Sequence, residues 1–245
     1  MHRPSVDIVI PVLNEERALP LCIATLRGFL ADAIPNPWGI VIADNGSDDR
    51  TPEVGQALAN EYSEVSYVRL EQRGRGRALR KTWLDSHADL VSYMDVDLST
   101  GLEAFPPMVN ALEEGYDLAV GSRLARGATV SKRKLQREIT SRGYNLLIKA
   151  MFMTRFSDAQ CGFKGLTREA ALVLVPHVVD QAWFFDTELL LIAEKRGFWI
   201  KDIPVAWADD PDTRVKVLKT AADDVKGLLR LRFGGLPRVS RPSSG

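Results

Sequence analysis

Cysteine and histidine are scarce in this chain of 245 residues, which holds two cysteines and three histidines. Cys22 and Cys161 are too few for a disulfide framework or a cysteine-based zinc site. His2, His87 and His177 lie outside every polar loop discussed below. The sequence therefore gives no support to a disulfide-stabilised scaffold, a histidine-ligated zinc or a histidine-based catalytic triad.

Long apolar runs are also missing. No stretch reaches the roughly 18 apolar residues that a membrane-spanning helix needs. The first residues, MHRPSVDIVIPV, enter a strand-like segment without the apolar core of a signal peptide. We therefore expect a cytoplasmic protein, with peripheral contact at the inner face of the membrane as an open alternative.

The formal net charge is zero, which argues against a general nucleic-acid-binding protein. The charge is nevertheless uneven. Segment 121–156 holds nine Lys or Arg against Glu138 alone, and segment 214–245 holds eight basic and two acidic residues. A basic face of this kind suits an anionic substrate or an anionic membrane surface. A solvated helix face is an equally weighted alternative.

Strand and helix patterns alternate in the first half of the chain. Apolar runs predict buried strands over 6–12, 38–44, 65–70 and 90–95. Helices are predicted after Asn14, which we expect to cap the first one, and over about 52–62 and 75–87. Such alternation is typical of βαβ units in a parallel sheet. Helices on both faces would explain strands that are apolar throughout.

The pattern changes after residue 120. A basic loop leads to a predicted helix over about 135–155, followed by an irregular stretch, SDAQCGFKGLT. Two helices (about 168–175 and 186–196) and a strand (199–207) come next. An amphipathic helix with basic flanks precedes a tail, 234–245, that we expect to be disordered. The chain therefore predicts one α/β domain with a C-terminal amphipathic helix.

The ends of the four predicted strands are polar. The segments 11–16, 43–49, 71–79 and 95–100 are each rich in acids or glycines. In open parallel sheets, ligands bind at the carboxyl ends of the strands. We therefore expect these four loops to converge on one site.

Asp95 and Asp97, in the stretch DVD, are the most specific feature of that edge. Alternate residues of an extended chain point the same way, so the two carboxylates would lie side by side. That arrangement is costly unless a positive charge lies between them. Mg²⁺ or Mn²⁺ takes oxygen ligands and would stabilise a departing diphosphate. An Asp-rich surface turn is the alternative, but the position after a buried strand favours a metal.

Two further loops suit a nucleotide. Asp44 can accept from the N–H groups of a nucleobase, with an Asx turn that caps the next helix as the alternative. The stretch RGRGRAL (73–79) matches G-x-G-x-x-G incompletely, because Leu79 stands at the third glycine. An NAD site is therefore disfavoured. Its glycines and arginines better fit a turn that passes close to a nucleotide or phosphate.

Nine motifs occur in an order that resembles family 2 glycosyltransferases of GT-A fold, across about residues 6–220: IPVLNEE, ADNGSDDRT, GRGRALRKTW, DVDLS, GSRL, REITSRGYNLL, DAQCGFKGLTREAA, WFFDTELLLIAEKRGFWIKDIPVAW and DTRVK. The greatest similarity is to polyprenyl- and dolichyl-phosphate sugar synthases, especially the dolichyl-phosphate glucosyltransferase branch. The resemblance implies a Rossmann-like, mostly parallel sheet with helices on both faces. It also implies a nucleotide-diphosphate sugar donor, a divalent metal as cofactor, and inverting transfer to a lipid phosphate.

The resemblance also implies roles for individual residues. The nucleotide-sugar-binding residues would be Pro11, Glu15, Asp44, Asn45, Arg73, Gly76, Asp95, Val96, Asp97 and Arg214. The acceptor-binding residues would be Arg123, Arg137, Ser141, Arg142 and Asn145. A loop that closes over the sugar would contain Asp158, Gly162, Phe163 and Lys164. Asp95 and Asp97 would hold the metal, and Asp97, Arg123 and Arg137 would carry catalysis. Asn45 and Arg214 depart from the residues usual in the family, which are Asp and Lys.

The basic segment 121–156 bears on the acceptor. A phosphate monoester, with a second pKa near 6, is largely dianionic at neutral pH. It needs positioning by arginine, whereas a hydroxyl acceptor needs a general base. We therefore predict transfer of a hexose, glucose from UDP-glucose, to a polyprenyl phosphate. A hydroxyl acceptor is the alternative, and a non-catalytic nucleotide-sugar-binding module is a third hypothesis.

The predicted organisation follows from these assignments. Residues 1–213 form the glycosyltransferase domain, with 1–120 as the nucleotide-sugar half and 121–213 as the acceptor half. Residues 214–233 form the basic amphipathic helix. The apolar stretch 144–153 is either an ordinary core-facing helix or a helix at the membrane interface, with basic flanks for anionic lipid.

Overall fold

The structure is a computed structural model that describes the backbone of residues 3–131, 135–208 and 217–242, and the side chains of 3–131, 140–208 and 222–242. Its centre is a seven-stranded sheet of order β3-β2-β1-β4-β7-β5-β8. The strands are β1 Val6–Val12, β2 Trp38–Asp44, β3 Val65–Arg69, β4 Leu90–Met94, β5 Leu118–Ser122, β7 Phe163–Thr167 and β8 Ile200–Pro204. Only β7 runs antiparallel to its neighbours, β4 and β5.

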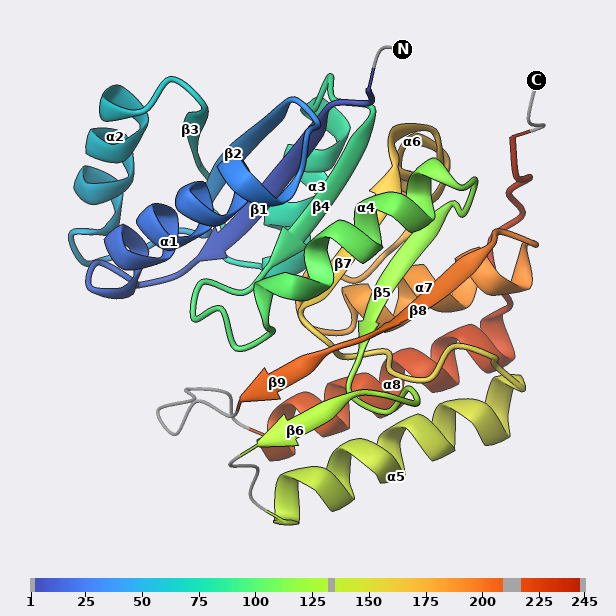
Figure 1. Ribbon diagram of the computed structural model, residues 1–245. Coiled ribbons are helices and arrows are strands. Elements are labelled where there is room, and N and C mark those ends of the chain that lie inside the picture. Colours follow the sequence, from blue (N-terminus) through green and yellow to red (C-terminus); the bar gives the residue numbers. More distant parts are fainter. Residues whose placement is uncertain (1–2, 132–134, 209–216, 243–245) are drawn as a thin grey trace.

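Helices cover both faces of this sheet (Figure 1). The helices packed on one face are α1 Ala18–Ala33, α2 Thr51–Glu61 and α4 Phe105–Glu113. Those on the other face are α3 Arg75–Asp85, α6 Arg168–Leu174 and α7 Phe185–Lys195. Each face has its own apolar core, and together the two cores bury the strands on both sides. The mostly parallel α/β architecture predicted from the sequence is confirmed.

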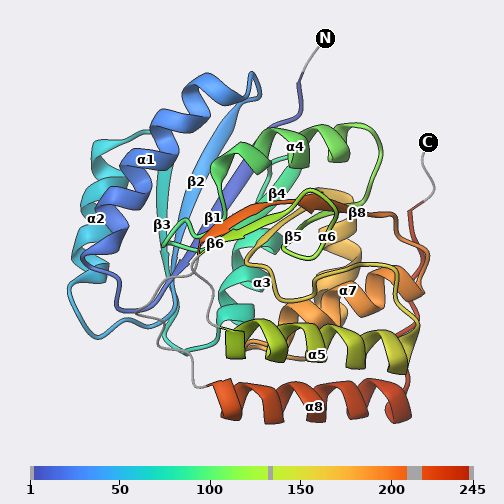
Figure 2. The same ribbon diagram turned by 60° about the horizontal axis from the view of Figure 1, so that its bottom comes forward.

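Two long helices form an additional layer outside α7. Helix α5 (Leu135–Phe152) and helix α8 (Val217–Gly234) lie side by side and run in the same direction, as Figures 1 and 2 both show. Ile148 and Phe152 of α5 and Leu228 and Leu231 of α8 join the core on the α7 side. Near the beginnings of these helices, β6 (Thr129–Ser131) and β9 (Ala206–Ala208) pair in a small parallel sheet. No helix in the described ranges is long and apolar enough to cross a membrane.

Several local expectations are wrong. Asn14 does not cap α1, because the helix begins at Ala18; Asn14 instead adopts a positive φ and its Oδ1 accepts from the Asp48 N–H. The stretch after Ser157 is irregular only in its first half, since Phe163–Thr167 is the central strand β7. The predicted strand 199–207 divides into β8 and β9.

The tail also differs from the expected disorder over its described part. The Arg196 guanidinium donates to the carbonyls of Leu236 and Pro237. Leu236 and Val239 pack against the core, and Arg241 pairs with Asp117 at 2.7 Å. These contacts hold the described part of the tail against α7 and the start of β5.

Candidate active site

The candidate site lies where the strand order reverses. β1 pairs with β2 along its whole length, from Val6 to Val12, but pairs with β4 only from Val6 to Val9. The carboxyl ends of β1 and β4 therefore separate, which is the position where open α/β sheets bind ligands. Pro11 lies in this last part of β1. Its missing N–H costs no bond to β4, because the pairing with β4 has already ended.

Asp95 follows β4 at this edge, and a buried arginine neutralises it. Arg75, the first residue of α3, contacts Asp95 Oδ1 through Nη2 at 2.5 Å and Asp186 Oδ2 through Nη1 at 3.0 Å. Asp186 stands in the first turn of α7 and also accepts from the Tyr93 hydroxyl at 2.7 Å. Lys164, on β7, lies 3.3 Å from the same carboxylate and donates to the Cys161 carbonyl at 2.5 Å.

This donor-side cluster (Arg75, Tyr93, Asp95, Lys164 and Asp186) combines segments that are far apart in sequence. Burial alone lowers the pKa of Arg75, but Asp95 and the other negative groups raise it above its ordinary value, so the guanidinium stays charged. Burial first, and then Asp186, raise the pKa of Tyr93, so its hydroxyl remains a donor. Two carboxylates face two cations, and the cluster is neutral as a whole. Trp183, half exposed, stacks its ring 5.0 Å from the Arg75 guanidinium.

Asp97 lies further out, on the turn that follows β4. It is exposed, and its Oδ1 accepts from the Ser99 N–H at 2.9 Å. Val96 and Asp97 form a turn that is closed by the Leu98 N–H donating to the Asp95 carbonyl at 3.0 Å, so the two acids do not continue the strand. Val96, between the two acids, is partly buried and packs against the apolar core on the α1 side.

Two carboxylates are the ligand set that Mg²⁺ commonly takes from a protein when substrate phosphates complete its coordination. Within the described residues, no group of three or more His, Cys, Asp or Glu side chains could hold a metal alone. A cation held by Asp95 and Asp97 would therefore need substrate phosphates to complete its coordination.

The predicted nucleotide end of the site is tightly hydrogen-bonded. Asp44, at the end of β2, is buried; its Oδ1 accepts from the Ser47 N–H at 2.9 Å and its Oδ2 from the Tyr67 hydroxyl at 2.7 Å. Burial, and then Asp44 itself, raise the pKa of Tyr67. Asn45 accepts from the Gly74 N–H at 2.6 Å, which ties the loop after β2 to the start of α3. The Asp44–Ser47 bond closes a local turn but does not cap α2, whose N-cap residue Arg50 makes no side-chain capping bond.

The other predicted nucleotide residues have different surroundings. The N–H of Glu15 donates to the Thr51 hydroxyl at 2.8 Å, which joins the first two loops of the site. Arg73 is exposed, donates to the Gly46 carbonyl and pairs with Asp48. Gly76 lies under α7: a Cβ there would be 2.6 Å from the Cβ of Phe185. Close packing of two helices therefore accounts for this glycine.

Arg123 follows β5 and forms a bidentate pair with Asp158. Its Nε lies 2.7 Å from Asp158 Oδ2 and its Nη2 2.9 Å from Oδ1. Although burial alone raises the pKa of Asp158, Arg123 holds it below its ordinary value. The Trp207 ring lies 5.3 Å from the guanidinium. We call Arg123, Asp158 and Trp207 the acceptor-side group.

The two sides meet at the segment 158–162. Asp158 at its start binds Arg123, and Gly162 at its end lies against Asp95, where a Cβ would be 1.7 Å from Oδ2. Only glycine leaves room for that carboxylate. Burial raises the pKa of Cys161, between them, to about 11, so its thiol is neutral and unreactive at physiological pH.

Two of the four residues of the predicted sugar loop lie in a strand of the central sheet. Phe163 and Lys164 belong to β7 and are fully buried, Phe163 packing edge-on against Phe105 with ring centroids 6.3 Å apart. Phe163 pairs with β4, and Lys164 pairs with β4 on one side and β5 on the other. The expectation that these two residues lie in a closing loop is wrong, because strand pairing fixes them.

Three of the remaining predicted acceptor residues project from different sides of helix α5. Ser141 and Asn145 face inward, and Asn145 binds the Ala159 N–H through its Oδ1 at 3.0 Å. Arg142 is exposed on the outer side of the helix. The side chains of Arg137 and Arg214 lie outside the described residues.

Sequence reasoning assigned no role to Arg75, Tyr93, Asp186 or Trp207. One signal was available for Asp186, which with Glu188 precedes the apolar run LLLIA inside the motif WFFDTELLLIA. Arg75 was considered only as part of a glycine-rich turn near a phosphate. Trp207 and Tyr93 sit in ordinary strand-like runs that carry no such signal.

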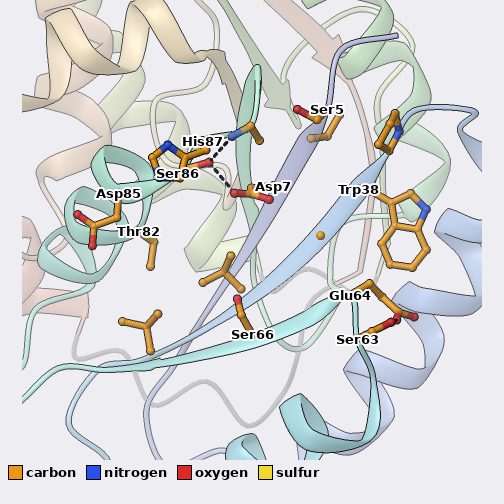
Figure 3. A pocket seen from close by; sticks show the side chains of 16 residues that line it. Ser5, Asp7, Trp38, Ser63, Glu64, Ser66, Thr82, Asp85, Ser86 and His87 are labelled. Atoms are coloured by element: carbon orange, nitrogen blue, oxygen red, sulfur yellow. Dashed lines mark hydrogen bonds between the residues drawn. The ribbon is translucent and has the colours of Figure 1, made fainter. Parts of the chain in front are cut away.

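A cavity of about 590 Å³ lies at the opposite edge of the sheet, at the amino ends of β1 and β2 (Figure 3). Ser5, Asp7, Trp38, Glu64, Ser86 and His87 help to line it. Asp7 accepts from the Ser86 hydroxyl at 2.5 Å, drawn as a dashed line in the figure. None of the predicted site residues with described side chains lines this cavity, so it is separate from the candidate active site.

The sheet is doubly wound, with acids at its topological switch point, and comparison with known proteins identifies the family. The family model "Glycosyl transferase family 2" matches residues 7–174. The chain therefore belongs to glycosyltransferase family 2. Glycosyltransferase AglD of Haloferax volcanii is 35% identical over 96% of this chain, which spans only 38% of that relative's length. Dolichyl-phosphate beta-glucosyltransferase ALG5C of Trichomonas vaginalis is 30% identical over 92% of this chain and 71% of its own.

Solved structures agree on the fold. Glucosyl-3-phosphoglycerate synthase from Mycobacterium tuberculosis, crystallised with Mn²⁺, UDP and phosphoglyceric acid, superposes with a TM-score of 0.71. The match covers 96% of this chain and 80% of the other at 19% identity. The same enzyme has been crystallised with UDP-glucose as well. These neighbours confirm the GT-A type of α/β fold predicted from the sequence motifs.

Proposed function

We propose that this chain transfers a hexose, glucose from UDP-glucose, to the phosphate of a polyprenyl phosphate, with inversion at the anomeric carbon. The observation that carries the proposal is the segment 158–162. Gly162, at one end, lies against the Asp95 carboxylate, which suits the donor's cation. Asp158, at the other end, binds the Arg123 guanidinium, which suits a phosphate. The names of the dolichyl-phosphate relatives and the UDP complexes of the structural neighbours support the choice of acceptor and donor.

The donor side needs added positive charge. The donor-side cluster is neutral within itself, and Asp97 adds a further negative charge at the same edge. A diphosphate at this edge would therefore be repelled without a counter-ion. Asp95 and Asp97 would hold Mg²⁺ or Mn²⁺, which when bound neutralises the charge of the leaving diphosphate. Arg75 fixes Asp95 in position through Oδ1, and Asp44 would bind the nucleobase.

The acceptor side suits a nucleophile that is already ionised. A phosphate dianion attacks the anomeric carbon through one oxygen, as the bond from that carbon to the diphosphate oxygen breaks and UDP leaves. Arg123 would orient the phosphate with its Nη1 group, since Asp158 occupies Nε and Nη2. Asp158 is bonded to Arg123, and the two Asp186 oxygens are bonded to Arg75 and Tyr93 with Lys164 nearby, so neither carboxylate is free to take a proton from an acceptor.

A hydroxyl acceptor is a second candidate, favoured by one observation. Burial, reinforced by the nearby Asp180, raises the pKa of Asp224 on α8 to about 7, which is the range of an effective general base. Its carboxylate accepts from Gln160, inside the segment 158–162. Asp224 is only 2% exposed, however, and would have to move to reach an acceptor.

Product analysis separates these candidates. Purified protein would be incubated with UDP-glucose or GDP-mannose, with and without Mn²⁺, and with a short-chain polyprenyl phosphate or the matching polyprenol. We expect a glucosyl phosphodiester of inverted configuration, from UDP-glucose and the phosphate only. Asp97→Asn should reduce turnover about a hundredfold, because the stabilisation supplied by a metal is worth several kcal/mol, while Asp224→Asn should retain it. Transfer to polyprenol that Asp224→Asn abolishes would establish the hydroxyl acceptor instead.

A further inference from the structure

The outer face of helices α5 and α8 exposes an unusual amount of apolar surface. Half of the exposed large apolar side chains in the described part of the chain belong to these helices or directly follow α5: Leu146, Leu147, Met153, Val225, Leu229 and Phe233. Figures 1 and 2 place the two helices side by side at the boundary of the molecule. We call these residues, with the basic residues between them, the α5–α8 face.

On α5 the exposed residues form one stripe. Arg142, Leu146 and Lys149 follow the i, i+4, i+7 spacing of a single helix face. Met153 comes next and is 82% exposed, with its N–H still bonded to the Lys149 carbonyl. The core therefore uses only the opposite side of the helix, through Ile148 and Phe152, and leaves this stripe exposed.

Helix α8 repeats the arrangement. Lys226, Leu229 and Phe233 follow the same three- and four-residue spacing, and Phe233 is 83% exposed. Leu228 and Leu231 point the other way, into the core. Met153 directly follows α5, and Phe233 is the residue before the last of α8. Because the helices run in the same direction (Figure 2), both residues lie at the same end of the pair.

The charge of the face has one dominant sign. Residues 140–155 contain Arg142, Lys149 and Arg155 and no acidic residue. On α8, Arg232 is exposed next to Phe233, and the acid Asp223 is paired with Lys226. A second copy of the chain would bring like charges together across this face, which opposes self-association.

We propose that the α5–α8 face docks on an anionic lipid surface, with Met153 and Phe233 entering the headgroup region. Apolar side chains flanked by Lys and Arg on a helix lying parallel to the surface are the features of an interfacial helix. Anionic headgroups attract each nearby basic side chain. The inference deepens the proposed function, because a polyprenyl phosphate acceptor resides in such a surface.

Docking on this face would also bring the acceptor-side group close to the lipid. The inner side of α5 carries Asn145, which binds the Ala159 N–H in the segment 158–162. The same helix thus contacts the lipid with its outer side and the catalytic segment with its inner side. A lipid phosphate at the membrane surface could then reach Arg123 while its chain remains in the bilayer.

Vesicle flotation of the full chain tests the inference. The probes are vesicles of phosphatidylcholine mixed with phosphatidylglycerol, and vesicles of phosphatidylcholine alone. The double variant Leu146→Glu/Phe233→Glu replaces two exposed apolar side chains of the face with negatively charged ones. The matched control is Leu21→Glu, because Leu21 is 72% exposed on α1, in the opposite helix layer. Thermal unfolding confirms that each variant is folded.

We expect the wild type and Leu21→Glu to float with the anionic vesicles, and less with the neutral ones or at high salt. The double variant should bind at least tenfold more weakly, and Lys149→Ala about fivefold more weakly, as expected for the loss of one basic residue near an anionic surface. No flotation of the wild type, or equal flotation of the double variant, would overturn the inference. So would a dimer in analytical ultracentrifugation that the double variant converts to a monomer.

The proposed function is tested separately in the same variants. Transfer to a short-chain, water-soluble polyprenyl phosphate needs no vesicle, so the wild type and the double variant should be equally active in that assay. Activity without flotation would remove the docking inference and leave the proposed function. Flotation without activity on any polyprenyl phosphate would support docking and remove the proposed lipid acceptor.

Discussion

The two sides of the active site hold their charges in different ways. On the donor side, Arg75, Asp95, Lys164 and Asp186 come from four separate elements and, apart from Asp95, are deeply buried. On the acceptor side, one arginine and one fully buried aspartate form a single bidentate pair next to the Trp207 ring. Buried charges that lose a partner are costly, and Asp158 is fully buried, so both sides should couple function to folding. A substitution on the acceptor side that keeps the positive charge should affect mainly acceptor binding.

The largest effect is expected on the donor side, from Lys164→Met. Lys164 is fully buried, and its loss leaves Asp186 with less positive charge. Removing one partner of a buried charge group costs about 3–5 kcal/mol, and urea denaturation would measure this loss of unfolding free energy. Lys81→Met, which breaks the exposed Lys81–Asp85 pair on α3, is the control and should have almost no effect. Equal stabilities would mean that the donor-side cluster does not support the fold.

Gly162→Ala tests the boundary between the two sides. The new Cβ would displace the Asp95 carboxylate, because it would lie 1.7 Å from Oδ2. A misplacement of about 1 Å can cost a hundredfold in rate, so we expect kcat to fall about that much. Gly143→Ala, on α5 with open space around it, should leave kcat unchanged and slightly stabilise the helix. Normal kcat in Gly162→Ala would show that the position of Asp95 is not critical.

Arg123→Lys should act on the acceptor side alone. Lysine keeps the positive charge but cannot form the bidentate pair or the planar contact with a phosphate. A lost charge-assisted hydrogen bond is worth about 1.5–3 kcal/mol, so the KM for the acceptor should rise about tenfold or more, with the KM for UDP-glucose unchanged. Steady-state kinetics with each substrate varied would measure both, and Arg126→Lys, at an exposed neighbouring position, is the control. A change in the donor KM alone would reverse the assignment.

A pH-dependent effect concerns Asp224, which lies behind the acceptor side. Its pKa is raised from 3.8 to about 7 in the folded protein, by burial and by Asp180, with smaller contributions from Asp223 and Asp186. Between these two pH values the folded state holds a proton that the unfolded state has lost, so this contribution to stability falls as the pH rises. Asp224→Asn should remove that fall, and its Tm should exceed that of the wild type at pH 8 but not at pH 5. Parallel melting curves of the two proteins would contradict this.

The sequence predicts the donor side better than the acceptor side, for physical reasons. Asp44 and Asp95 follow long apolar strands, and parallel strands bring their carboxyl ends together. The partners of Asp95 are harder to find, because Arg75 and Asp186 are 111 residues apart and meet only through the packing of α3 against α7. Strand β7 was missed because it is short, contains glycine and lysine, and inserts antiparallel between β4 and β5.

The outer helices show a similar limit. The sequence shows that α5 and α8 are amphipathic and basic. Each helix has apolar residues both on its core-facing side and on its exposed side, and the spacing of apolar residues does not tell the two sides apart. Only the structure separates Ile148, in the core, from Leu146, which is exposed. It likewise separates the inward Asn145 from the outward Arg142, although both were predicted to bind the acceptor.

The division between the two sides can be tested most directly by a crossed binding measurement. Isothermal titration calorimetry would compare the wild type, Asp97→Asn and Arg123→Lys, each titrated with UDP-glucose plus Mn²⁺ and separately with a short-chain polyprenyl phosphate. We expect Asp97→Asn to lose donor affinity and keep acceptor affinity, and Arg123→Lys to do the reverse. If each variant weakened both ligands equally, or if Arg123→Lys weakened only the donor, the separation of a donor side from an acceptor side would be contradicted.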